Sequence, residues 1–127
     1  MTQKDISSTI KFDKMCVTYY ANKLLSCKAR GIEFNLTYTQ VKNMLRAKRC
    51  QYTGITLTKS SGAKQLPTDV TIERIDSSKP YETGNVCAVS YAANMAMNNM
   101  EQWFGKNSIN AMKKMTKYVS KHNAKSK

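Results

Sequence analysis

The chain has 127 residues, a length that suits one domain with one modest hydrophobic core. Its 21 lysine and arginine residues against 8 acidic ones give a formal net charge of +13, which favours nucleic acid as a partner over an acidic membrane surface. No apolar run is long enough to cross a bilayer and the N-terminus carries no apolar leader, so we expect a cytoplasmic protein with no membrane partner.

The N-terminal part, residues 1–48, predicts two helices. Residues 1–8 are polar, and we expect them to be frayed. From residue 10 to residue 28 the apolar side chains follow a spacing close to helical, and Gly31 suits the left-handed position after a helix. The apolar positions of this first helix are Phe12, Met15, Cys16, Tyr19, Tyr20, Leu24 and Leu25.

The second helix is expected from residue 38 to about residue 47. Thr37 and Gln40 have the spacing of a capping box, and Leu36 with Val41 has that of a hydrophobic staple. The residues predicted to be buried are Val41, Met44 and Leu45. The other face carries four basic residues, which form either a solvated rim, the favoured interpretation, or a phosphate-facing patch: Lys42, Arg46, Lys48 and Arg49.

The central part, residues 49–104, predicts a strand hairpin followed by a helix. Residues 70–75 alternate in the manner of a strand, and residues 86–89 give a second strand after a tight loop. Residues 91–104 then have helical periodicity. We expect the apolar stripe of this helix to be core: Ala93, Met97, Met100 and Phe104, with Ala96 and Trp103 beside it.

The tail, residues 105–127, predicts a final helix that begins near Asn107 or Ser108. Its inward positions would be Ile109, Met112, Met115, Tyr118 and Val119. The remainder of the tail is strongly basic through Lys113, Lys114, Lys117, Lys121, Lys125 and Lys127. The single histidine, His122, lies in this basic segment, and we interpret it as solvated rather than catalytic.

An ordered set of short motifs follows the predicted turn, strands and helix. These motifs are Cys50-x-Tyr-Thr-Gly54, Glu73-Arg-Ile-Asp76, Pro80-Tyr81, Gly84-Asn-Val86 and Ala93-Asn94. Together they resemble the HNH endonuclease family, in particular its small phage-type members, over roughly half of the chain or more. The resemblance implies an α+β fold: a single domain in which a ββα-metal core is flanked by N- and C-terminal helices.

The resemblance also implies roles for individual residues. Glu73 would bind a divalent cation, Mg²⁺ or Mn²⁺, with Asn94 as its partner from the helix, and both supply the hard oxygen ligands that these ions prefer. Asn85 would be the central asparagine that organises the hairpin. Asp76 would cap the hairpin loop or support the metal.

Arg74 occupies the position at which the family keeps its general-base histidine. Arginine stays protonated and cannot accept a proton from water, but it can clamp a phosphate. The base would then be Asp76, a metal-bound hydroxide or a substrate phosphate. Asp69, Glu73 and Asp76 lie close in sequence, and we expect a small negative pocket within the basic surface.

The four cysteines contain no Cys-x-x-Cys pair, so we expect reduced thiols and no structural zinc. Thr53 stands where a zinc-binding relative would carry the second cysteine of the first pair. Cys50 and Cys87 are interpreted as small buried residues.

Three functions from different classes remain open. The first is a metal-dependent endonuclease that hydrolyses phosphodiester bonds of DNA. The second is a catalytically inactive HNH-fold factor of phage origin that binds nucleic acid or a host protein, and the third is an RNA-binding protein. The chain would act as a monomer or a homodimer. The residues expected to contact nucleic acid are Lys42, Arg46, Lys48, Arg49, Lys79, Lys113 and Lys117.

Overall fold

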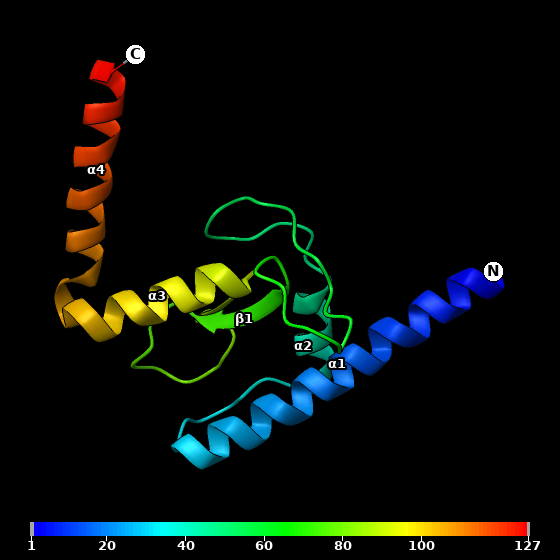
Figure 1. Cartoon of the computed structure of the whole chain (residues 1–127). Coiled ribbons are helices and arrows are strands. Elements are labelled where there is room, and N and C mark those ends of the chain that lie inside the picture. The colour runs from blue at the N-terminus through cyan, green and yellow to red at the C-terminus, as the bar shows by residue number, and fades with distance from the viewer. Residues whose placement is uncertain (1, 127) are drawn as a thin grey trace. The chain divides into compact units, whose positions relative to one another are not determined.

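The computed structural model describes residues 2–126, and within that range it does not describe the side chains of residues 4, 5 and 124–126. The chain is mixed α+β, with the elements α1 (Gln3–Arg30), α2 (Tyr38–Leu45), β1 (Val70–Arg74), β2 (Val86–Ser90), α3 (Tyr91–Phe104), a short 3-10 turn (Gly105–Asn107) and α4 (Ser108–Ser126), as Figure 1 shows. They fall into two compact units, residues 2–94 and residues 95–126, which are considered separately. Lys127 and the side chain of Lys125, both assigned to the basic tail above, lie outside the described part.

The two strands form an antiparallel hairpin. Its register pairs Thr71 with Val89 and Glu73 with Cys87, so these four side chains lie on one face. The side chains of alternate residues, among them Arg74, lie on the other face. The predicted strand boundaries differ from the observed ones by a single residue at one end of each strand.

Helix α1 begins at Gln3, so the expectation of a frayed segment over residues 1–8 is wrong for the described residues from Gln3 onward. It ends as predicted at Gly31, whose φ of 68° is the left-handed conformation that a residue without a Cβ adopts at low cost. The Gly31 N–H donates to the Lys28 carbonyl and the Ile32 N–H donates to the Cys27 carbonyl. These two bonds satisfy carbonyls that the end of a helix leaves open.

Helix α2 begins with the predicted capping box. The Gln40 N–H donates to Thr37 Oγ1 at 3.2 Å, and the Thr37 N–H donates to Gln40 Oε1 at 2.9 Å. Leu36 and Val41, the predicted staple pair, are both buried. Helix α2 contacts α1 on one side and both strands on the other, and the core of the first unit lies between these elements. Its buried apolar residues are Cys16, Cys27, Leu36, Val41, Leu45, Cys50, Leu57, Val70, Ile72, Tyr81, Cys87 and Val89.

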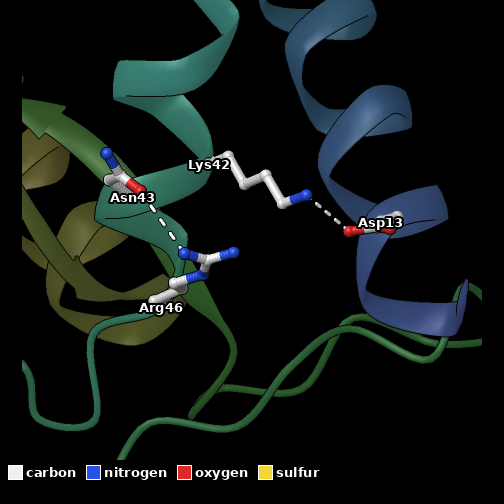
Figure 2. Close-up of polar contacts among 4 residues, drawn as sticks. All are labelled: Asp13, Lys42, Asn43 and Arg46. Atoms are coloured by element: carbon white, nitrogen blue, oxygen red, sulfur yellow. Dashed lines mark hydrogen bonds and ion pairs between the residues drawn. The ribbon is translucent and has the colours of Figure 1, made fainter. Parts of the chain in front are cut away.

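The solvent side of the contact between α1 and α2 is polar. Lys42 Nζ lies 2.6 Å from Asp13 Oδ1, and Arg46 Nη1 lies at the long hydrogen-bonding distance of 3.5 Å from Asn43 Oδ1 (Figure 2). The Arg46 guanidinium also lies over the Phe12 ring, 5.7 Å from its centroid. Lys42 and Arg46 thus contact other side chains of this protein surface, which fits their interpretation as part of a solvated rim.

In the second unit, the expectation of buried apolar stripes is wrong for several of their residues, whereas Met97, Met100 and Met112 are half-buried. Trp103 and Phe104 of α3 are 68% and 42% exposed, and Tyr118 of α4 is 74% exposed. Ile109, Met115 and Val119 are about half exposed as well. Helical spacing places apolar side chains on one face of a helix, but it does not determine whether another element covers that face.

None of the described helices combines the length and the apolar character needed to span a membrane.

Candidate functional site

The loop between the strands is held from within by Asn85, which is 8% exposed. Its side chain accepts from the Asp76 N–H at 2.9 Å, and its Nδ2 donates to the carbonyls of Asp76 at 3.0 Å and Pro80 at 2.9 Å. Gly84, just before it, has a φ of 91°, a conformation that favours glycine. The loop is therefore a fixed platform at the turn end of the hairpin.

Asp76 caps the start of this loop. Its Oδ1 accepts from the Ser78 N–H at 2.9 Å and from Ser78 Oγ at 2.6 Å. These two hydrogen bonds lower the pKa of the exposed Asp76 carboxyl, and the nearby charges of Lys79 and Arg74 lower it further. The Asp76 carboxylate is thus hydrogen-bonded within its own turn, in the manner of an Asx turn.

Glu73 lies near the end of β1 and is only 7% exposed. Its cross-strand neighbour is Cys87, which is 9% exposed. Tyr52, from the turn at residues 50–54, is a neighbour of both side chains and interacts with them. Burial raises the pKa of Tyr52, and Cys87 and Glu73 raise it further.

The turn that carries Tyr52 is docked on β2. The Gln51 N–H donates to the Ala88 carbonyl at 2.9 Å, and the Ser90 N–H donates to Cys50 Sγ at 3.3 Å. The pKa of Cys50 falls to about 7, because the hydrogen bonds from Thr53, Ser90 and Tyr52 outweigh the opposing effect of burial. Thr53 therefore contributes hydrogen bonds to Cys50 from the position that a second zinc-binding cysteine would occupy.

Asn94 lies in the first turn of α3, close to the same face of the hairpin. Its Nδ2 donates to Thr71 Oγ1 at 3.1 Å, and Thr71 Oγ1 in turn donates to the Val89 carbonyl at 3.1 Å. Thr71 precedes Glu73 by two residues on the same face of β1. The side chains of Asn94 and Glu73 therefore belong to one surface, in which Asn94 directly contacts Thr71.

Arg74 leaves the opposite face of the hairpin. Its Nη1 donates to the Lys79 carbonyl at 3.1 Å, and its guanidinium lies 5.1 Å from the centroid of the Tyr81 ring. Lys23 from α1 lies 5.0 Å from the same centroid. Tyr81 itself is 5% exposed and packs against Phe34, so its ring is not accessible for stacking on a sugar or base.

Glu73 and Asn94 offer a carboxylate and an amide oxygen to a divalent cation. Mg²⁺ and Mn²⁺ accept one carboxylate with an amide oxygen when water and phosphate fill the other positions, so Glu73 and Asn94 fit in kind. Among the described residues, no group of three or more His, Cys, Asp and Glu side chains is placed to hold a metal. The expected negative pocket is wrong. Asp69 is fully buried and accepts hydrogen bonds from Thr58, Gln65 and the Leu66 N–H. Asp76 is exposed and is hydrogen-bonded within its own turn, so the two carboxylates have no partner in common.

The remaining predicted cations belong to both units. Arg49 donates from Nη1 to the Gly54 carbonyl at 3.1 Å, which supports the turn that carries Tyr52. Lys48 and Lys79 are exposed in the first unit, and Lys113 and Lys117 are exposed on α4. These exposed side chains are accessible to a polyanion in each unit.

Sequence reasoning missed Tyr52, Thr71 and Cys87 as neighbours of the predicted site. Thr71 and Cys87 could have been found from strand alternation and hairpin register once Glu73 was placed. Tyr52 could not, because its position depends on how the turn docks against β2.

Comparisons with protein-family models, curated proteins and solved structures gave no match to this chain.

Proposed function

We propose that the chain is an HNH-type, divalent-metal-dependent endonuclease of phage origin that hydrolyses phosphodiester bonds of DNA. One observation carries the proposal: a buried carboxylate, Glu73, lies on the same surface as Asn94 from the helix that directly follows the hairpin. The net charge of +13 supports a polyanionic substrate.

Glu73 and Asn94 would hold Mg²⁺ or Mn²⁺. A bound cation of this kind polarises a phosphate and stabilises the charge that develops on its oxygens. Asn85 fixes the loop beside the site, and Asp76 and Lys79 lie on that loop. Arg74 is always a cation and cannot take the proton of an attacking water, so its role would be contact with a backbone phosphate on its own face of the hairpin.

The test is nicking of a supercoiled plasmid in Mg²⁺, in Mn²⁺ and in EDTA. Glu73→Gln removes the proposed ligand charge while keeping the shape of the side chain. Glu33→Gln, which changes an exposed glutamate of the same unit, is the matched control. Cutting that requires the metal, survives in Glu33→Gln and is lost in Glu73→Gln is the expected result. Equal cutting by both variants would contradict a role for Glu73.

A second function, nucleic-acid binding without cleavage, is favoured by one observation. Arg74 stands where the family has its base, and its guanidinium is used in contacts with Tyr81 and the Lys79 carbonyl. In this case the plasmid would remain intact in every metal while gel retardation persists in a salt-dependent way. Parallel retardation of single-stranded RNA and duplex DNA would identify the preferred nucleic acid.

A further inference from the structure

Tyr52 and Cys87 lie beside Glu73 in a small polar cluster, and the proposed chemistry uses neither of these two neighbours. Two backbone features build it: the register that pairs Glu73 with Cys87, and the hydrogen bond from the Gln51 N–H to the Ala88 carbonyl at 2.9 Å, which holds the turn against β2. The turn enters this cluster from a segment some twenty residues before Glu73 in the chain. The cluster is therefore a tertiary contact, formed only when the turn and the hairpin are both folded.

We propose that Tyr52 is a positioning residue for Glu73: its hydroxyl donates a hydrogen bond to the carboxylate and fixes the orientation in which that carboxylate meets a divalent cation. This inference rests on the proposed function, in which Glu73 is a metal ligand. Carboxylates that bind metals are commonly held by such outer hydrogen bonds, and loss of one costs about 10–100-fold in metal affinity or activity.

The chemistry of the three groups sets the direction of the hydrogen bond. An ionised carboxylate only accepts, whereas a phenol with an ordinary pKa near 10 carries its proton throughout the neutral range. The Cys87 thiol is a weak donor and a weak acceptor, so Tyr52 is the strong donor available to Glu73 within this cluster. A fixed rotamer also spares Glu73 part of the conformational entropy that it would otherwise lose on binding a cation.

The exposure of the three residues makes the inference testable. Tyr52 is 39% exposed, whereas Glu73 and Cys87 are 7% and 9% exposed. Tyr52→Phe keeps the ring and removes only the hydroxyl, so the packing of the turn should survive. Tyr118→Phe, at a position on α4 that is 74% exposed, makes the same chemical change away from the cluster and is the matched control.

The experiment is a calorimetric measurement of Mn²⁺ binding to the full chain without DNA, with thermal unfolding recorded for each variant. We expect Tyr52→Phe to weaken Mn²⁺ binding about tenfold and Tyr118→Phe to leave it unchanged. In a Glu73→Gln background, Tyr52→Phe should add nothing, because the group that it positions is absent. In plasmid nicking, saturating Mn²⁺ should restore the rate of Tyr52→Phe, since the defect lies in metal affinity rather than in the fold.

Three results would overturn the inference, and they are distinguishable. If the unmodified chain and Tyr52→Phe bind Mn²⁺ equally while Glu73→Gln does not, Tyr52 has no positioning role but the metal site stands. If the unmodified chain binds no Mn²⁺, the metal-dependent function fails and the role of Tyr52 fails with it. A Tyr52→Phe variant that loses thermal stability and is not rescued by Mn²⁺ would assign Tyr52 a purely structural role.

Discussion

The Tyr19 hydroxyl accepts a hydrogen bond from the Ile72 backbone N–H at 2.8 Å, although the two residues are 53 positions apart in the chain. Ile72 is in β1, and this bond satisfies a donor on the side of the strand that β2 does not pair. Val70 on the same edge donates to the Thr58 carbonyl at 2.9 Å. Helix α1 and the chain before β1 together close an edge that would otherwise present open backbone groups.

Tyr19→Phe should destabilise the fold, because it leaves the Ile72 N–H without its acceptor beside a buried strand. The expected loss in the free energy of unfolding is roughly 1–2 kcal/mol. Urea denaturation followed by circular dichroism measures it. Tyr118→Phe, at an exposed hydroxyl, should change the same quantity by less than about 0.5 kcal/mol. A loss in Tyr19→Phe no larger than in this control would show that the hydrogen bond contributes nothing net.

Asn85→Ala should loosen the loop between the strands. It removes three hydrogen bonds, two to the backbone of Asp76 and one to the Pro80 carbonyl. We expect a loss of about 2 kcal/mol in the free energy of unfolding, since these backbone groups can be only partly solvated in their place. Asn43→Ala, at an exposed position of α2, is the control. Hydrogen exchange of the Asp76 amide should rise in Asn85→Ala and not in Asn43→Ala.

The ion pair between Asp13 and Lys42 should be weak and dependent on salt. Both side chains are partly solvated, at 45% and 24% exposure, so water and mobile ions screen their attraction. A double-mutant cycle with Asp13→Asn and Lys42→Met should give a small favourable coupling at low salt. The coupling should vanish at about 1 M NaCl, where the Debye length is about 3 Å. A coupling that persists at high salt would contradict this account.

Cys50 should ionise before Cys16 and Cys87 as pH rises. Burial alone would raise its pKa, but the hydrogen bonds from Thr53, Ser90 and Tyr52 bring the pKa of Cys50 to about 7. Burial raises the pKa of Cys16 and Cys87 instead. Alkylation by iodoacetamide, followed by mass spectrometry, should therefore increase for Cys50 through about pH 7 and for the other two only at higher pH.

The lowered pKa of Cys50 also makes the free energy of unfolding depend on pH. Because the folded pKa of Cys50 lies below the ordinary value of about 8.5, the thiolate is favoured by folding. Its stabilising contribution is complete above the ordinary value and is lost as pH falls through about 7. Cys50→Ser should remove this part of the pH dependence of unfolding. Equal alkylation profiles for Cys16, Cys50 and Cys87 would contradict the lowered pKa of Cys50.

Replacing Lys113 and Lys117 together with alanine should weaken DNA binding and reduce its salt dependence. If each lysine neutralises one phosphate, the slope of log K against log salt should become shallower by about 1.8. Fluorescence anisotropy across a salt series measures the slope. Lys11→Ala with Lys14→Ala, an exposed pair on α1, is the matched control and should leave it nearly unchanged. An identical slope in both double variants would show that α4 does not contact phosphate.

The sequence by itself determined the local elements. Gly31, the Thr37 and Gln40 capping box and the alternation along residues 70–75 depend only on neighbours within a few positions, because caps, turns and strand periodicity are local properties. The boundaries of α2, the hairpin and α3 were accordingly predicted closely. Glu73, Asn85 and Asn94 were selected as candidates from their order in the chain.

Only the tertiary structure decided which of these residues meet. The docking of the turn on β2 brings Tyr52 to Glu73 and Cys87. Asp69 is hydrogen-bonded to Thr58 and the Leu66 N–H in the segment before β1, so it does not contribute to the expected acidic pocket. The apolar stripes of α3 and α4 were predicted to be core, yet much of them is exposed in the second unit. Periodicity specifies which side chains share a face, whereas burial and contact depend on the packing of segments that are distant in sequence.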